Sequence, residues 1–215
     1  TAVGYQALYT NSTGTGNVAV GNQALYSSTL SYCTAVGNQA GYYNTGSYNT
    51  YIGQGAGYNQ TSGTANTFVG YNSGSNSSNN ACNYNTSMGH QALTAVTTGN
   101  NNTCIGYQAG FNIATGTSNL CLGYGAGNGN LGFGSGVQSG TNNILIGYIP
   151  TLNASGSESN EIVITTRGQS VAGKGGSSGF IDPGGGGVYQ GNNSASWSTT
   201  SDQRLKKNIV DNNVG

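Results

Sequence analysis

Charge is what this sequence has least of. Only 5% of its 215 residues are charged, and five Lys and Arg residues balance five Asp and Glu residues to a formal net charge of zero. Nucleic acids and anionic membrane surfaces are bound through basic surfaces, so neither is an expected partner. No apolar run approaches the ~18 residues of a membrane span, and the sequence as it opens at Thr1 shows no charged-then-apolar leader. The chain opens inside a repeat, which indicates a fragment of a longer protein.

Cysteine and histidine are also scarce. The four cysteines are too few for a disulfide scaffold of this length and lack the CxxC spacing of zinc sites (Cys33, Cys82, Cys104 and Cys121). Cys104 and Cys121 occupy equivalent positions of adjacent repeats, where a ladder of buried thiols is a more probable arrangement than a disulfide. The single histidine, His90, stands where other repeats have Tyr, Asn or Gln, so we expect a surface position. We expect neither a metal nor a cofactor.

Acidic residues, which glycan-cleaving enzymes need in pairs, number five and all lie outside the repeats. They are Glu158, Glu161, Asp182, Asp202 and Asp211. No pairing is evident, so we expect no enzymatic activity on a separate substrate.

Glycine, by contrast, is abundant, at 39 residues, and it marks a repeat of 16 to 24 residues. Copies include NVAVGNQAL, CTAVGNQAG, NTYIGQGAG, NTCIGYQAG and NILIGYIP. The anchoring glycines are Gly4, Gly21, Gly37, Gly53, Gly70, Gly89, Gly106, Gly123 and Gly147. Low charge and abundant Gly, Asn, Ser and Thr could also indicate disorder, but this period favours one turn of a narrow β-solenoid per repeat.

Two apolar columns precede the glycine. The residue directly before it is aliphatic in every copy, from Val3 and Val20 to Ile146, and we expect this column to fill the interior. The preceding residue points the opposite way in a strand, and it is also largely apolar, as in Ala19, Tyr51 and Phe68. This second face is expected to meet other chains, most simply around a threefold axis.

Other columns predict local structure. Alanine or serine recurs three residues after the glycine, where backbones or chains must approach closely. Asparagine recurs four residues before it, and stacked amides can bond from turn to turn. The glycine itself suits a corner with positive φ. The intervening polar segments suit tight turns and a second, more polar strand.

An aromatic column lies five residues after the glycine: Tyr9, Tyr26, Tyr42, Tyr58 and Phe111. Such rings could stack on sugars of a cell-surface glycan, but stacking on one another is the stronger interpretation. A threonine column at Thr34, Thr50, Thr67, Thr86 and Thr103 suggests ice binding, although a single column is not the flat two-column array that this function uses.

The repeats over residues 1–149 resemble the trimeric β-roll heads of YadA-type adhesins and the xAxGxxA repeats of phage fibres, with turns of 16–17 rather than about 14 residues. This resemblance implies a trimer. Residues 150–200 follow as a terminal turn, for which NEIVI at 160–164 is the candidate, and a Gly-rich extended connector with little regular structure over 168–200.

The final segment, 201–215, contains SDQRLKKNIV after GGGVYQGNNSASWS. It resembles the beginning of the endosialidase-type intramolecular chaperone domain, peptidase family S74, which cleaves itself from fibres. The resemblance implies Ser201 as nucleophile, Lys206 as its base and a cleavage boundary at Ser201 and Asp202. Spacing alone favours Ser201 as the cap of a helix among solvated basic residues, and the resemblance reverses that preference.

We therefore expect an all-β, parallel β-solenoid of about nine turns that assembles as a homotrimer. The expected function is that of an extracellular shaft and host-attachment protein of a phage tail fibre, with a cell-surface glycan or protein as receptor. A bacterial trimeric adhesin or surface fibre is the alternative.

Overall fold

The structure is a computed structural model, and it describes residues 1–27, 29–76, 81–131, 136–152, 155–184, 186–191 and 198–199. Ser201, Asp202 and Lys206, together with the rest of segment 201–215, lie outside the described residues. The proposed cleavage site therefore remains a prediction.

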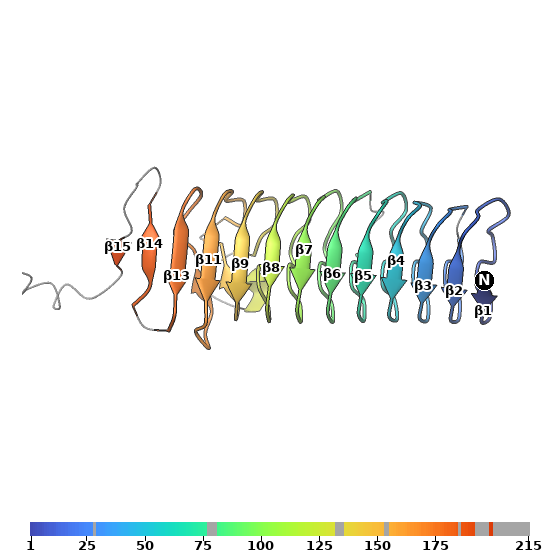
Figure 1. Ribbon diagram of the computed structural model, residues 1–215, viewed down its shortest axis with the longest axis horizontal. Coiled ribbons are helices and arrows are strands. Elements are labelled where there is room, and N and C mark those ends of the chain that lie inside the picture. Colours follow the sequence, from blue (N-terminus) through green and yellow to red (C-terminus); the bar gives the residue numbers. More distant parts are fainter. Residues whose placement is uncertain are drawn as a thin grey trace, which may run out of the picture.

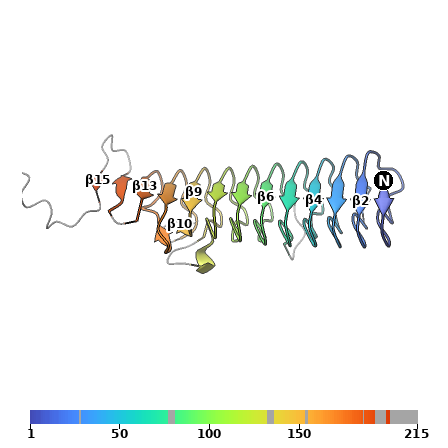
Figure 2. The ribbon, with the colours of Figure 1, turned by 60° about the horizontal axis from the view of Figure 1, so that its bottom comes forward.

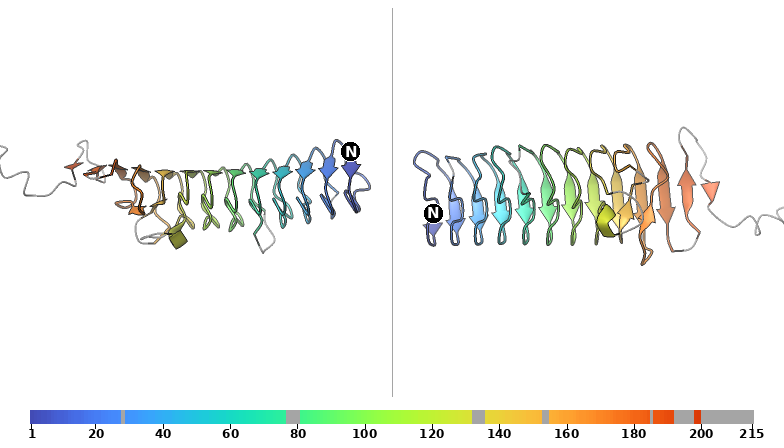
Figure 3. Two further views of the ribbon diagram at one scale, coloured as in Figure 1. Left: turned by 90° about the horizontal axis from the view of Figure 1, so that it is seen from below. Right: turned by 180° about the vertical axis from the view of Figure 1, so that it is seen from behind.

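The chain forms an elongated all-β solenoid in which each turn contributes one strand to a single long sheet (Figure 1). Strands β1 to β9, β11 and β13 lie side by side in sequence order and pair in parallel, which encloses about ten turns. Figures 2 and 3 show that the strands make one flat side of the solenoid and the loops make the other. A parallel β-solenoid was predicted, and its existence is confirmed.

The strands are short. Their bounds are β1 (Ala2–Val3), β2 (Val18–Val20), β3 (Thr34–Val36), β4 (Thr50–Ile52), β5 (Thr67–Val69), β6 (Thr86–Met88), β7 (Thr103–Ile105), β8 (Leu120–Leu122), β9 (Ile144–Gly147), β10 (Pro150–Thr151), β11 (Ile162–Thr165), β12 (Val171–Ala172), β13 (Gly179–Asp182), β14 (Val188–Gln190) and β15 (Ser198–Thr199). A 3₁₀ turn, η1, covers Gly129–Leu131.

The anchoring glycine ends each strand at a corner that only glycine fits. Its φ lies between 121° and 140° from Gly4 to Gly147, a region that side chains rarely adopt. A Cβ atom at Gly89 would lie 2.2 Å from the carbonyl oxygen of Gly106 in the next turn. The glycine column thus allows neighbouring turns to approach at strand spacing.

The interior is filled by the column two residues before the glycine, so our assignment of the two faces was wrong. Ala19, Tyr51, Phe68, Cys104 and Leu145 are fully buried, whereas residues of the column next to the glycine face outward. Both columns are apolar, so alternation alone could not decide which one faces inward. The decisive partner is the alanine column three residues after the glycine, which is buried from Ala24 to Ala126 and closes the same core.

Side-chain volumes in the core compensate one another. Leu25 and Leu93 stand four residues after the glycine in turns whose strands contribute the small Ala19 and Ser87 to the core. Where the strand contributes Phe68, the corresponding position is Gly74, and a Cβ there would lie 2.4 Å from the Phe68 ring. In the turn of Ala35 both positions are small, and the space at Gly41 is taken by Tyr51 and Leu25 of the neighbouring turns.

The loops opposite the sheet form turns, and the described loops before Gly147 contain no strand where a more polar second strand was predicted. In the last two turns, β10 and β12 pair in parallel as a separate two-stranded sheet. Left-handed residues such as Gln23 and Leu25 interrupt any extended run. The loops nevertheless stack turn upon turn through backbone hydrogen bonds, for example Leu25 N to Ala40 O at 3.0 Å and Tyr43 N to Tyr58 O at 3.0 Å.

A buried asparagine ladder runs along the corner where each turn enters its strand, as predicted. Asn102 Nδ2 donates to Asn85 Oδ1 at 3.0 Å, and Asn119 Nδ2 donates to Asn102 Oδ1 at 3.0 Å. Each amide also donates across the core to a backbone carbonyl, as from Asn102 to Gly116 O at 2.8 Å. Cys33 replaces the asparagine in one turn and Glu161 in another.

Beyond Gly147 the solenoid continues further than expected. NEIVI forms strand β11, which pairs with β9 and, on its other side, with β13 (Gly179–Asp182). Strands β12, β13, β14 and β15 lie within 168–200, where we expected little regular structure. Buried Val163 and Phe180 extend the core column despite the high glycine content, and the sheet ends only where β14 and β15 reverse direction.

Candidate interaction surface

The outer face of the sheet carries a continuous aliphatic column. It consists of the residues directly before the corner glycines: Val3, Val20, Val36, Ile52, Val69, Met88, Ile105, Leu122 and Ile146. Val36, Ile52, Met88 and Leu122 are exposed, and the rest of the column from Val20 onward is half-buried. We call the sheet surface made by this column and its flanking columns the outer face.

An aromatic column flanks the aliphatic one over the C-terminal half of the solenoid. Tyr71, His90, Tyr107, Tyr124 and Tyr148 directly follow the corner glycines and stack in order, with ring centroids 5.0 to 5.3 Å apart. His90 is exposed within this stack, as predicted. In the N-terminal half the same column has Tyr5 and is then polar, with Asn22, Asn38 and Gln54, so the apolar surface is wider toward the C-terminal half.

Threonines make the other flank of the outer face. Thr34, Thr50, Thr67, Thr86 and Thr103 begin successive strands and are half-buried. Charged side chains are absent from residues 1–157. The outer face therefore offers apolar contact and neutral hydrogen bonds, without charge repulsion between two copies.

The predicted tyrosine column five residues after the glycine stacks on itself, which confirms the structural interpretation. Tyr9, Tyr26, Tyr42 and Tyr58 lie 4.8 to 5.3 Å apart between ring centroids. Tyr43 packs edge-on against Tyr42 and Tyr58. Tyr26 and Tyr42 are covered on both ring faces by their neighbours in the stack. Phe111 stands apart from it, because the adjacent turns have Thr94 and Asn128 at this position.

The four cysteines are buried and unpaired, as predicted for Cys104 and Cys121. A hydrogen bond to the Cys121 thiol and burial raise the pKa of Cys104 well above its ordinary value. Burial raises the pKa of the Cys82 thiol to about 11. The Cys82 and Cys104 thiols therefore stay protonated near neutral pH and are not nucleophiles.

The acidic residues are used structurally where the structure describes them. Arg167 pairs with buried Asp182, with an Nη1 to Oδ2 distance of 3.2 Å. Glu161 Oε1 accepts hydrogen bonds from Gly175 N at 2.7 Å and Ser178 Oγ at 3.2 Å, while its buried Oε2 has no partner. Within the described ranges, no three His, Cys, Asp or Glu residues gather as metal ligands.

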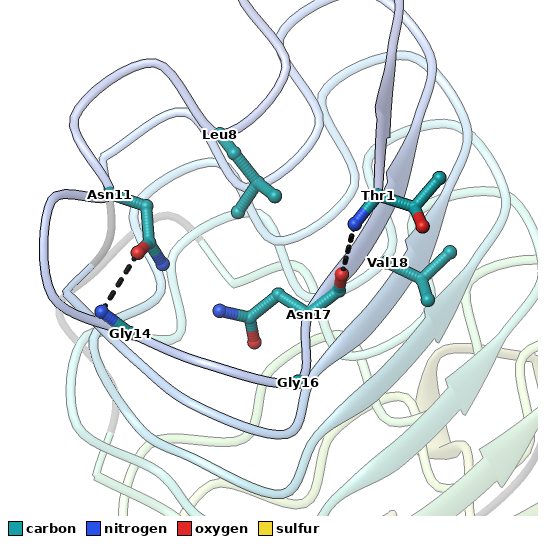
Figure 4. A pocket seen from close by; sticks show the side chains of 7 residues that line it. All are labelled: Thr1, Leu8, Asn11, Gly14, Gly16, Asn17 and Val18. Carbon is teal, nitrogen blue, oxygen red and sulfur yellow. Dashed lines mark hydrogen bonds between the residues drawn. The ribbon is translucent and has the colours of Figure 1, made fainter.

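A hollow opens at the N-terminal end of the solenoid, lined by Thr1, Leu8, Asn11, Gly14, Gly16, Asn17 and Val18 (Figure 4). Thr1 N donates to Asn17 O at 2.7 Å, and Asn11 Oδ1 accepts from Gly14 N at 2.9 Å. The hollow lies beside Thr1, at the end of the first described turn. It gathers no catalytic group.

One set of surface residues was missed by the sequence analysis. Tyr32, Tyr48 and Tyr84 stand five residues before a corner glycine and are among the most exposed aromatic residues. The same glycine alignment that gave the other columns would have shown them.

No family model, no curated protein and no solved structure matches the chain. Among the described residues, no helix has the length and apolar character of a membrane span.

Proposed function

We propose that this chain is the shaft of an extracellular attachment fibre in which three copies pack side by side through the outer face. The observation that carries this proposal is the uninterrupted aliphatic column that the solenoid leaves uncovered. Its exposed members, including Ile52 and Met88, are 37% to 57% accessible in the single chain. An apolar stripe of this length on a soluble protein usually marks an interface.

A second copy suits this face better than an unrelated protein. The aliphatic, aromatic and threonine columns repeat at the strand spacing, so an identical copy in parallel register presents matching rows. Three copies around a common axis would place three aliphatic columns together. The trimer expected from the sequence is thus proposed through the column that we had assigned to the interior.

The fibre is proposed to belong to a phage tail, because segment 201–215 resembles the beginning of an S74-type chaperone. In this proposal Ser201 is the nucleophile and Lys206 the base of a self-cleavage at Ser201 and Asp202, and no separate substrate is hydrolysed. A removable chaperone suits a parallel solenoid, whose non-local pairings form slowly.

A bacterial trimeric adhesin or surface fibre is the second candidate. It is supported by the likeness of residues 1–149 to YadA-type heads. The complete gene distinguishes the two, since an adhesin continues into a coiled-coil stalk and a membrane anchor, whereas a tail fibre continues into a chaperone.

The test is the mass of the purified chain by light scattering, beside intact mass spectrometry. We expect a trimer that Ile52→Glu and Met88→Glu convert to a monomer, because each buries charge in an apolar interface. Thr98→Glu, on an exposed loop position, is the matched control and should leave the trimer intact. A monodisperse wild-type monomer would refute the trimeric shaft. A new chain end beside Ser201 would support self-processing.

A further inference from the structure

The missed tyrosines occupy strained corner positions. The residue five before the corner glycine is left-handed in successive turns, with φ of 59° at Tyr32, 65° at Tyr48, 56° at Ala65 and 58° at Tyr84. Bulky residues seldom adopt this conformation, at a cost of about 1 kcal/mol or more each. Tyr48 and Tyr84 are each 64% exposed, so burial does not repay that cost.

Two of these tyrosines, Tyr32 and Tyr48, form a stack, and Tyr84 stands two turns beyond Tyr48 in the same column. Tyr32 lies over Gly16 of the preceding turn, where an added Cβ would be 2.7 Å from its ring. Tyr48 stacks on Tyr32 with centroids 5.3 Å apart and planes 9° apart. The next turn has Ala65 at this position, and the turn after it has Tyr84. The column therefore leaves a slot between Tyr48 and Tyr84, with Ala65 as its floor.

The slot has the thickness of one ring. The two turns between Tyr48 and Tyr84 correspond to two strand spacings, or about 10 Å. A ring placed midway would lie about 5 Å from each tyrosine, which is the separation of stacked rings. The spacing thus suits a single inserted ring and leaves no room for two.

Neutral polar groups lie beside this slot. The residues directly before Tyr48, Ala65 and Tyr84 are Ser47, Thr64 and Asn83. Thr64 N and Oγ1 both bond Asn83 Oδ1, at 2.8 and 2.9 Å, and Asn83 Nδ2 bonds Asn100 Oδ1 at 3.3 Å. These side chains are part-buried and ordered by hydrogen bonds, so hydroxyl and amide groups border the two aromatic walls.

We propose that the slot formed by Tyr48, Ala65 and Tyr84 binds one ring of a neutral saccharide. A pyranose has apolar C–H faces for the two tyrosines and a hydroxyl-rich rim for the serine, threonine and asparagine groups. The Thr64 hydroxyl donates to Asn83 and keeps its lone pairs, which a sugar hydroxyl can use and an apolar aromatic side chain cannot. The absence of charge over residues 1–157 excludes recognition of an anionic sugar by ion pairing.

This inference deepens the proposed attachment role by naming the receptor chemistry, but it does not depend on the trimer. A chain that is monomeric and binds saccharide refutes the trimeric shaft and supports the slot. A trimer that binds no saccharide supports the trimeric shaft and refutes the slot.

The first test places a tyrosine ring at position 65, between Tyr48 and Tyr84. The wild-type chain is screened on an array of neutral hexose, pentose and N-acetylhexosamine oligosaccharides, and the affinity for the best-bound oligosaccharide is measured by titration calorimetry. Ala65→Tyr should abolish binding because its ring occupies the slot, in a backbone conformation that Tyr48 already adopts. Ser118→Tyr places the same residue at the equivalent left-handed corner outside the slot and should bind as wild type.

Removing a wall is the complementary test. Tyr48→Ala and Tyr84→Ala should each weaken binding about tenfold or more, through loss of a stacking face. Tyr5→Ala, which removes an exposed tyrosine of another column, should not. Circular dichroism checks that each variant is folded. Binding of no oligosaccharide by the wild type, or binding that survives Ala65→Tyr, overturns the proposal, as does a Ser118→Tyr loss equal to that of Ala65→Tyr.

Discussion

At the scale of single residues, the asparagine ladder shows how polar groups can stabilise an interior. The Asn102 amide donates to Asn85 and Gly116, and its Oδ1 accepts both N and Nδ2 of Asn119. Removing this amide leaves its buried partners on Asn85, Gly116 and Asn119 without a hydrogen bond, so the cost of their desolvation is no longer compensated.

Asn102→Ala should therefore lower the free energy of unfolding by roughly 3 kcal/mol, because Asn119 loses the acceptor for its backbone N–H. Chemical denaturation measures the change. Asn22→Ala, at an exposed position, is the control and should change stability by less than about 0.5 kcal/mol. Equal losses in the two variants would argue against the ladder as a source of stability.

Glu161 occupies a place in this ladder that an amide fills better. Burial raises its pKa, and the nearby Glu158 charge adds to this, against hydrogen bonds from Gly175, Lys174 and Ser178 that lower it. Since the folded chain then holds the proton more tightly than the unfolded chain, stability is greatest below the unfolded pKa and falls as pH rises toward the folded pKa.

Glu161→Gln removes this ionisation and should stabilise the protein at pH 7 by about 1 kcal/mol, with little gain at pH 3.5. Thermal melts at the two pH values provide the measurement. Glu158→Gln is an informative contrast. Although burial opposes it, hydrogen bonds from the backbone and from Ser155 lower the Glu158 pKa, so this variant should lose stability at pH 7. A destabilised Glu161→Gln variant would show that the carboxylate is preferred.

At the scale of the repeated turn, the core depends on an exchange of volume between two positions. In one turn, Phe68 of the strand fills the core space next to Gly74. In two other turns, Leu25 and Leu93, which stand at the position equivalent to Gly74, fill that space instead. Leu25 and Leu93 adopt φ of 49° and 52°, close to the 60° of Gly74, so leucine can take that backbone conformation.

Phe68→Ala should cost about 3 to 5 kcal/mol through the cavity it leaves. Gly74→Leu alone should also destabilise, because its side chain meets the Phe68 ring. The double variant should be more stable than the sum of the two losses predicts, by about 1 kcal/mol or more. Strict additivity in denaturant unfolding would contradict volume exchange.

The turn is also the scale at which the sequence was most informative. Gly89 and its equivalents fixed the period, the strands, the positive-φ corners and the asparagine ladder, since each depends on local geometry. The sequence could not show which of two apolar columns faces inward, because Val36 and Ala35 are both compatible with burial. The sequence also gave no sign of β13, a strand that begins at Gly179 within a glycine-rich segment. The proposed slot was missed as well, because it depends on Ala65 standing where neighbouring turns have tyrosine.

At the scale of the whole molecule, the described surface from residue 1 to 152 holds no charged side chain. Any association through the outer face is then driven by apolar burial, which salt does not screen. The proposed trimer should persist or tighten as NaCl rises from 0.05 to 1 M, as measured by sedimentation equilibrium. Dissociation at high salt would point to ionic contacts from the charged residues beyond Glu158.

The equal pitch of the turns has a consequence for reach. Ten turns at about 4.8 Å each span about 48 Å, and each turn contacts chiefly its two neighbours. A gene that gains or loses one 17-residue segment would lengthen or shorten the solenoid by one turn while its surface chemistry stays the same. The number of turns therefore sets the distance at which the proposed Tyr48–Tyr84 slot is held, and this distance can evolve independently of the slot itself.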